Sequence, residues 1–121
     1  MKHAPEFLKV VAEAKTHIKE LTIQEVKAKL DRGEKFHFVD VREDDEWRAS
    51  HAKGAIHIGK GVIERDIEGL IPDKNAEIIL YCGGGFRSAL AADSIQKMGY
   101  KYVLSMDGGM RGWHNSGFPE E

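Results

Sequence analysis

The apolar run that ends at Cys82 constrains the fold of this chain more than any other feature. Ile78, Ile79, Leu80, Tyr81 and Cys82 form the longest unbroken apolar stretch in the 121 residues. A strand with one face in water alternates apolar and polar residues, whereas a strand buried on both faces of a parallel sheet is apolar throughout. The run is also far shorter than the ~18 residues that suggest a membrane span. We therefore expect a soluble protein whose central strand lies at 77–82.

Shorter strand and helix patterns alternate along the rest of the chain. The expected elements are an edge strand around Leu21, helices at 22–33, 43–50, 62–71 and 86–98, and further strands at 36–41, 55–58 and 100–105. Alternation with short links predicts an α/β fold, a three-layer α/β/α sandwich around a mostly parallel sheet with right-handed crossovers. Ligands bind such sheets beyond the carboxyl ends of the strands. The residues expected at that rim are Asp40, Ile58, Cys82 and Ser105.

The first 20 residues are expected to form a helical extension. Val11, Ala14 and Ile18 lie 4, 7 and 11 positions after Phe7, which is the period of an amphipathic helix, and Pro5 suits a first turn. We expect this helix over 5–19, where it could cap the sheet or mediate dimerisation, so the protein is expected to be a monomer or a weak homodimer. At the other end of the chain, a glycine-rich segment at 107–113 is expected to close the domain.

Composition excludes several classes of function. Lysine and arginine number 18 and aspartate and glutamate 20, so the net charge of −2 lacks the basic footprint that nucleic acid requires. The single cysteine can form neither an intramolecular disulfide nor a zinc cage, and the six histidines show no metal-ligand spacing. Because no signal-peptide pattern occurs at the N-terminus, we expect a cytoplasmic protein with no metal, no cofactor and no membrane partner.

The loop after the central strand combines a thiol with consecutive glycines. Cys82 ends the strand, Gly83, Gly84 and Gly85 turn the chain, and a helix is expected from Phe86. Glycines let the backbone curl with several N–H groups pointing inward, and a helix N-terminus adds further N–H groups and a positive dipole. Such surroundings favour the ionised, nucleophilic form of a cysteine without a histidine base. The alternative is a small buried residue before a tight turn, but three glycines carry an entropy cost that a plain turn rarely justifies.

Four motifs stand in order along residues 21–119. They are Val39-Asp40-Val41-Arg42-Glu43 followed by Glu46-Trp47, His51 to His57 with Gly54-Ala55-Ile56, Cys82 to Arg87, and Gly108-Gly109 followed by Trp113. Together they resemble the single-domain rhodaneses, a family of sulfurtransferases. The resemblance implies a rhodanese-like domain at 21–119 with a five-stranded parallel sheet flanked by helices, preceded by the extra N-terminal helix.

The resemblance further implies that Cys82 is the catalytic residue. In rhodaneses the loop cysteine accepts a sulfane sulfur as a persulfide and passes it to a thiophilic acceptor. We expect thiosulfate or a similar donor, and cyanide, a thiol or a protein as acceptor. Because the chain has no second cysteine, a persulfide on Cys82 cannot form an internal disulfide and must await an external acceptor. The expected substrate-binding residues are Gly83, Gly84, Gly85, Phe86, Arg87 and Ser88.

Loop length separates this interpretation from the phosphatases that share the fold. Those enzymes place five residues between cysteine and arginine, enough to cradle a phosphate, whereas four residues separate Cys82 from Arg87. The shorter loop suits a single extra sulfur atom. Arg87 could either bind substrate or bond a carboxylate that holds the loop closed. Another alternative is a non-catalytic rhodanese-like module that carries sulfur or binds a partner protein.

Other charged residues near the expected rim have less specific interpretations. Lys60 and Arg65 follow the strand that ends at Ile58 and could attract an anionic donor, although solvated surface charge is the favoured interpretation. Asp40 and Arg42 are interpreted as parts of a structural ion pair, with Glu46 as a candidate partner of Arg42.

Overall fold

The computed structural model describes residues 3–121, which form five strands, six α-helices and one short 3-10 helix. The strands are β1 (Lys19–Leu21), β2 (His37–Asp40), β3 (Ile56–His57), β4 (Glu77–Tyr81) and β5 (Tyr102–Met106). The helices are α1 (Pro5–Lys15), α2 (Ile23–Asp31), α3 (Asp44–Ala49), η1 (Lys60–Val62), α4 (Ile63–Leu70), α5 (Phe86–Gln96) and α6 (Gly109–Asn115).

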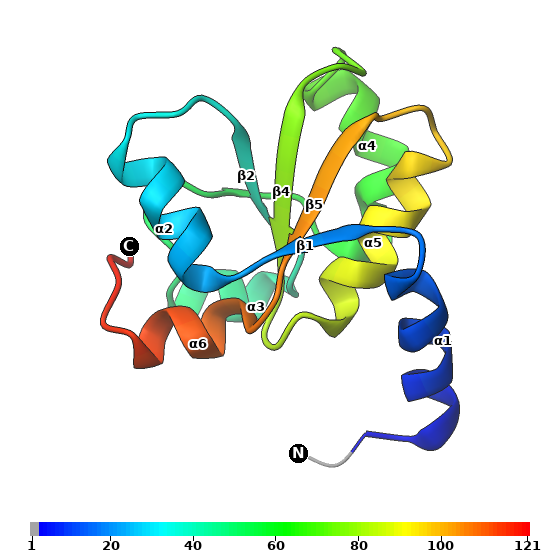
Figure 1. The fold of residues 1–121 in the computed structure, drawn as a ribbon, viewed down its shortest axis with the longest axis horizontal. Coiled ribbons are helices and arrows are strands. Elements are labelled where there is room, and N and C mark those ends of the chain that lie inside the picture. The colour runs from blue at the N-terminus through cyan, green and yellow to red at the C-terminus, as the bar shows by residue number, and fades with distance from the viewer. Residues whose placement is uncertain (1–2) are drawn as a thin grey trace.

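The five strands form one parallel sheet in the order β1-β5-β4-β2-β3. Figure 1 shows β4 between β2 and β5 of this sheet. β4 is its central strand, paired on one side with β2, where Leu80 lies opposite Val39, and on the other with β5, where Ile79 lies opposite Leu104. The apolar run therefore lies where the sequence predicts it. The α/β fold class, the five-stranded parallel sheet and the additional N-terminal helix are confirmed.

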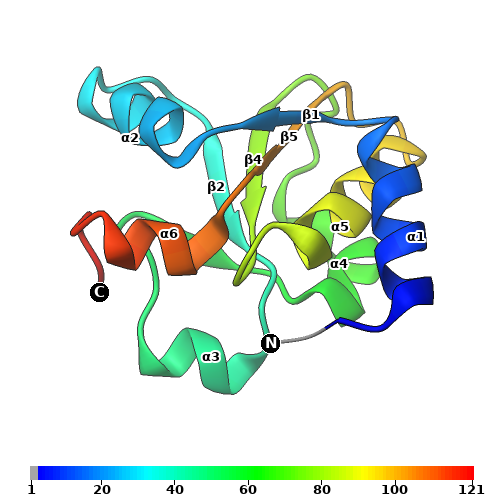
Figure 2. The same ribbon diagram turned by 60° about the horizontal axis from the view of Figure 1, so that its bottom comes forward.

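Each face of the sheet is covered by its own hydrophobic core. Ile78, Leu80 and Cys82 point to the side of α4 and α5, whose buried residues include Ile67 and Ile95. The alternate residues of β4 point to the side of α2 and α6, where the core contains Val26, Met110 and Trp113. Figure 2 shows these helices on opposite sides of the sheet. The two cores explain why β4 has no polar residue between Ile78 and its carboxyl end.

The N-terminal helix is shorter than its apolar periodicity predicts. α1 ends at Lys15 rather than at residue 19, and Ile18 lies in the bend that follows. The next residues form β1, in which Lys19 pairs with Leu104 of β5, so the expected edge strand around Leu21 is confirmed. Pairing with β5 satisfies the backbone groups of residues 19–21, and a continued helix would leave that edge of the sheet uncovered.

The start and the end of α2 follow its sequence signals. Thr22 Oγ1 accepts a hydrogen bond from the Glu25 N–H at 3.0 Å, and Glu25 Oε1 accepts one from the Thr22 N–H at 3.0 Å, which completes the predicted capping box. Gly33 beyond the helix has a φ of 71°, a left-handed value that favours glycine.

Among the helices of residues 3–121, none has the length and apolar character needed to cross a membrane.

The glycine-rich segment at 107–113 contains a helix that the sequence analysis did not predict. α6 begins at Gly109, and its Met110 and Trp113 are buried in the core against α2. Glycine has low helix propensity, so the segment reads as a loop in sequence. Burial of the two large apolar side chains compensates for that low propensity.

Candidate active site

The cysteine loop, residues 82–87, joins the end of β4 to the first turn of α5. Cys82 is 1% exposed, and its Sγ accepts a hydrogen bond from the Gly85 N–H at 3.1 Å. Ser88 Oγ lies 3.5 Å from Sγ and 2.8 Å from Ser105 Oγ, so the sulfur has a second polar neighbour on α5. Within residues 3–121, one backbone N–H is hydrogen-bonded to the sulfur, where the sequence analysis expected several.

Two observations favour glycine at position 85. Its φ of 100° is in the left-handed region, which side chains rarely adopt, and a Cβ there would lie 3.2 Å from Asp107 Oδ1. This backbone conformation directs the Gly85 N–H toward Sγ. The left-handed conformation of Gly85 therefore allows its N–H to bind the Cys82 sulfur.

The first turn of α6 packs against the cysteine loop and hydrogen-bonds to its backbone. The Met110 N–H donates to the Cys82 carbonyl at 2.7 Å, and the Arg111 N–H donates to the Gly83 carbonyl at 3.0 Å. A Cβ on Gly109 would lie 2.7 Å from the carbonyl carbon and oxygen of Gly83. Only glycine allows this approach, which explains why the Gly108-Gly109 motif accompanies the cysteine loop.

Arg87 closes the loop by binding Glu46 on α3. Its Nη1 donates to Oε1 at 2.7 Å and its Nη2 donates to Oε2 at 3.1 Å, a bidentate pair whose side chains are 32% and 34% exposed. The hydrogen bond from Arg87 holds the pKa of Glu46 below its ordinary value. Of the two roles considered for Arg87, the structure shows the bond to a carboxylate.

Arg42 is not a partner of Glu46, and that part of the prediction is wrong. Asp40 is fully buried and accepts from the Arg42 Nη2 at 2.8 Å and from the Arg42 backbone N–H at 2.9 Å. The same Nη2 also donates to the Ser50 carbonyl at 2.7 Å. Arg42 is only two residues after Asp40, and its side chain folds back to bind the Asp40 carboxylate. The carboxylate of Glu46 is bound by Arg87 instead. The structural interpretation of the Asp40–Arg42 pair is confirmed.

A cavity of about 470 Å³ opens onto the sulfur. Five of the predicted site residues line it, namely Cys82, Gly83, Gly84, Phe86 and Arg87. Gly85 and Ser88 are buried beneath it beside Sγ. Lys60 and Arg65, the other candidates, are absent from its lining, and Arg65 is paired with Asp66 at 2.7 Å.

Four residues that the sequence analysis did not assign to the site also line this cavity: His3, Phe7, Glu46 and Arg111. Arg111 is an exposed side chain of α6, and a Cβ on Gly84 would lie 3.4 Å from its Nη1. None of the ion pairs within residues 3–121 involves Arg111, in contrast to Arg87. The only signal in the sequence is its place two residues after the Gly108-Gly109 motif.

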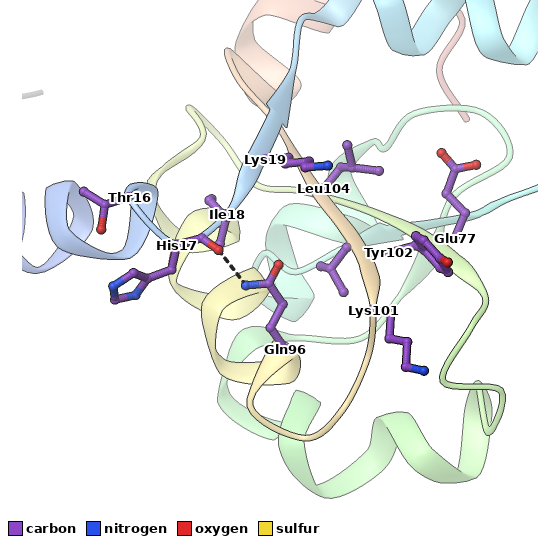
Figure 3. A pocket seen from close by; sticks show the side chains of 10 residues that line it. Thr16, His17, Ile18, Lys19, Glu77, Gln96, Lys101, Tyr102 and Leu104 are labelled. Atoms are coloured by element: carbon purple, nitrogen blue, oxygen red, sulfur yellow. Dashed lines mark hydrogen bonds between the residues drawn. The ribbon is translucent and has the colours of Figure 1, made fainter.

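A larger cavity of about 610 Å³ lies at the other end of the sheet (Figure 3). It is lined from the α1–β1 link, the beginnings of β4 and β5, and α5, where Gln96 donates to the His17 carbonyl at 2.9 Å. Glu77 in its lining is five residues before Cys82 along β4, roughly 16 Å away. This cavity is therefore remote from the thiol, and the smaller cavity is the candidate active site.

The two hydrophobic cores, the parallel sheet and the thiol at its carboxyl edge define an α/β domain built around a cysteine loop. A sequence model described as the rhodanese-like domain matches residues 22–116. The chain therefore belongs to the rhodanese-like family, as its motifs predict.

Two relatives from Bacillus subtilis (strain 168) cover most of the chain. The protein named "Putative sulfurtransferase YtwF" is 33% identical over 103 residues, which are 85% of this chain and 97% of the relative. The protein named "Putative sulfur carrier protein YrkF" is 35% identical over 102 residues, 84% of this chain and 54% of the relative. This chain therefore spans about half the length of YrkF.

A solved structure from Rhodopseudomonas palustris is similar over the whole chain. Its description reads "Protein of Unknown Function RPA3614, Possible Tyrosine Phosphatase". The TM-score is 0.88 at 28% sequence identity, and the alignment covers 100% of this chain and 98% of the other. The similarity thus includes α1, which lies outside the matched residues 22–116.

Proposed function

We propose that this protein is a sulfurtransferase that moves a sulfane sulfur from thiosulfate or a similar donor to cyanide or a thiol through a persulfide on Cys82. The observation that carries the proposal is the position of the Cys82 sulfur. It lies at the base of a cavity, next to the N-terminus of α5, and accepts a hydrogen bond from the Gly85 N–H. Membership of the rhodanese-like family supports it.

In the first half-reaction, the Cys82 thiolate attacks the outer sulfur of thiosulfate. A bond forms between Sγ and that sulfur, the S–S bond of thiosulfate breaks, and sulfite leaves with the electron pair. The negative charge moves one atom outward, onto the terminal sulfur of the persulfide. The dipole of the eleven-residue helix α5 favours an anion at this point.

In the second half-reaction, cyanide or a thiolate attacks the outer sulfur of the persulfide. The bond between the two sulfurs breaks, and the electron pair returns to Cys82 as the thiolate. No oxidant or reductant is consumed, because the sulfane sulfur keeps its oxidation state. The cycle is therefore ping-pong and leaves the enzyme as it began.

The two arginines that line the cavity, Arg87 and Arg111, have different roles. Arg87 is committed to Glu46 and fixes the end of the cysteine loop relative to α3. Arg111 has no such partner within residues 3–121, and its guanidinium lies over Gly84. We assign Arg111 the binding of the anionic end of the donor, the sulfonate group of thiosulfate.

A second candidate function is a sulfur carrier that holds the persulfide for a partner protein without turnover on small thiols. The similarity to the relative named as a sulfur carrier favours this candidate. It uses the same thiol and the same loop, so only the fate of the persulfide separates the two.

Steady-state formation of thiocyanate from thiosulfate and cyanide tests the enzymatic proposal. The wild-type protein should turn over with ping-pong kinetics, and the Cys82→Ser variant should be inactive. A persulfide that forms but reacts with neither cyanide nor small thiols would instead support the carrier. Hydrolysis of an aryl phosphate without thiocyanate formation would replace both with a phosphatase.

A further inference from the structure

Helix α1 and the residues just before it supply two aromatic rings to the active-site cavity. His3 and Phe7 line the cavity together with Phe86 of the cysteine loop. The ring centroids of His3 and Phe86 are 4.7 Å apart, and those of Phe7 and Phe86 are 6.1 Å apart, both in edge-on geometry. The distances are typical of aromatic pairs. One wall of the cavity is therefore aromatic, and two of its three rings, those of His3 and Phe7, come from outside residues 22–116.

This aromatic wall is fixed to the domain. Val11 and Ala14 of α1 are each 3% exposed, and the helix packs along α5, the helix that follows the cysteine loop (Figure 2). Beyond the helix, Gln96 of α5 donates to the His17 carbonyl at 2.9 Å. Phe7 itself is half-buried, so part of its ring remains available to a ligand.

The cavity is cationic as well as aromatic. Arg111, which has no ion-pair partner within residues 3–121, lies over Gly84 and lines the same cavity as Cys82. The cavity volume of about 470 Å³ falls within the range of pockets for organic ligands, roughly 300–1,000 Å³. A sulfonate on Arg111 and a sulfur on Cys82 make no use of the aromatic rings. The wall is thus suited to a larger molecule than thiosulfate.

We propose that the acceptor is a small organic thiol that carries both an aromatic or apolar group and a carboxylate. This rests on the proposed sulfurtransferase function and names its acceptor class. The apolar group packs on Phe7 and His3, the carboxylate binds Arg111, and the thiolate reaches the outer sulfur on Cys82. The thiolate displaces the Cys82 thiolate from that sulfur, so the products are an organic persulfide and free enzyme.

The selectivity of the cavity can be measured without any sulfur transfer by alkylating Cys82. We compare the rate for 4-(iodoacetamido)benzoate with that for iodoacetamide, each divided by its rate with a free thiol. The wild-type protein should favour the aromatic reagent. Phe7→Ala should reduce this preference about fivefold, in line with the energy of an aromatic contact. Arg111→Gln should reduce it about tenfold, in line with a hydrogen bond to a charged group.

Two further variants keep this result interpretable. Leu8 lies on the same helix as Phe7, is 42% exposed and does not line the cavity. The Leu8→Ala variant should therefore keep the wild-type preference. His3 precedes α1, so the His3→Ala variant leaves the buried residues of that helix unchanged. It should lower the preference for the aromatic reagent without affecting folding. Equal rates for both reagents in the wild-type protein, or an equal loss in Leu8→Ala and Phe7→Ala, would overturn the proposal.

Transfer kinetics then connect the cavity to the reaction. With 4-(mercaptomethyl)benzoate and mercaptoacetate as acceptors, the ratio of the two kcat/KM values should fall about fivefold in Phe7→Ala and stay constant in Leu8→Ala. Loss of the alkylation preference in Phe7→Ala in a protein that forms no persulfide would support the ligand class and refute the sulfurtransferase. An unchanged ratio in a protein that does form the persulfide would refute only the acceptor class.

Discussion

The contact between α6 and the cysteine loop predicts a large difference between two glycine substitutions. Gly109 has a φ of 54°, and a Cβ there would lie 2.7 Å from the Gly83 carbonyl. Gly117 has a φ of 71°, with no atom within 4 Å of a Cβ. Each change to alanine incurs about 1–2 kcal/mol of left-handed strain. Gly109→Ala adds a clash with fixed backbone, about 1–3 kcal/mol. We expect losses of about 2–5 kcal/mol for Gly109→Ala and about 1–2 kcal/mol for Gly117→Ala.

Urea unfolding followed by circular dichroism measures both losses, and Gly117→Ala serves as the control because it shares the strain but not the clash. The rate of Cys82 alkylation provides a second measurement, since displacement of the Gly83 carbonyl should alter the loop in Gly109→Ala alone. Equal losses of unfolding free energy in the two variants would refute the claim that α6 supports the loop by close contact.

Two ion pairs give further predictions. Because Arg87 lowers the pKa of Glu46, the pair stabilises the fold above the ordinary pKa of 4.5 and loses this contribution as pH falls through the lowered value. Glu46→Gln should therefore lower the free energy of unfolding by about 1 kcal/mol at pH 7, and the difference from wild type should vanish in acid; a constant difference would contradict it. Asp40→Asn should cost about 3–5 kcal/mol in urea unfolding, because it leaves the Arg42 charge buried without a partner; a loss under 1 kcal/mol would contradict that.

Much of the fold could be predicted because its signals are local. The apolar run at 78–82 identifies the central strand, and the Thr22–Glu25 capping box identifies the start of α2. The errors occur where tertiary contacts outweigh local preference. Pairing with β5 ends α1 early, and burial of Trp113 makes a helix of a glycine-rich segment.

The candidate site also contains residues that a local sequence pattern predicts and residues that only the fold brings together. The cysteine loop is continuous in sequence, so its thiol, its glycines and Arg87 could be recognised together. His3, Phe7 and Arg111 reach the same cavity from α1, its preceding residues and α6, and no local pattern links them to Cys82. Glu46 is a candidate partner of Arg42 in the sequence, whereas its partner in the structure is Arg87, 41 positions away, which no local pattern indicates.

The intact mass of the protein after incubation with thiosulfate tests the central claim most directly. The wild-type protein should gain the mass of one sulfur atom, and a reductant or a thiol acceptor should remove it. The Cys82→Ser variant should gain nothing under the same conditions. An unchanged mass in the wild-type protein, or the same gain in Cys82→Ser, would contradict a persulfide on Cys82.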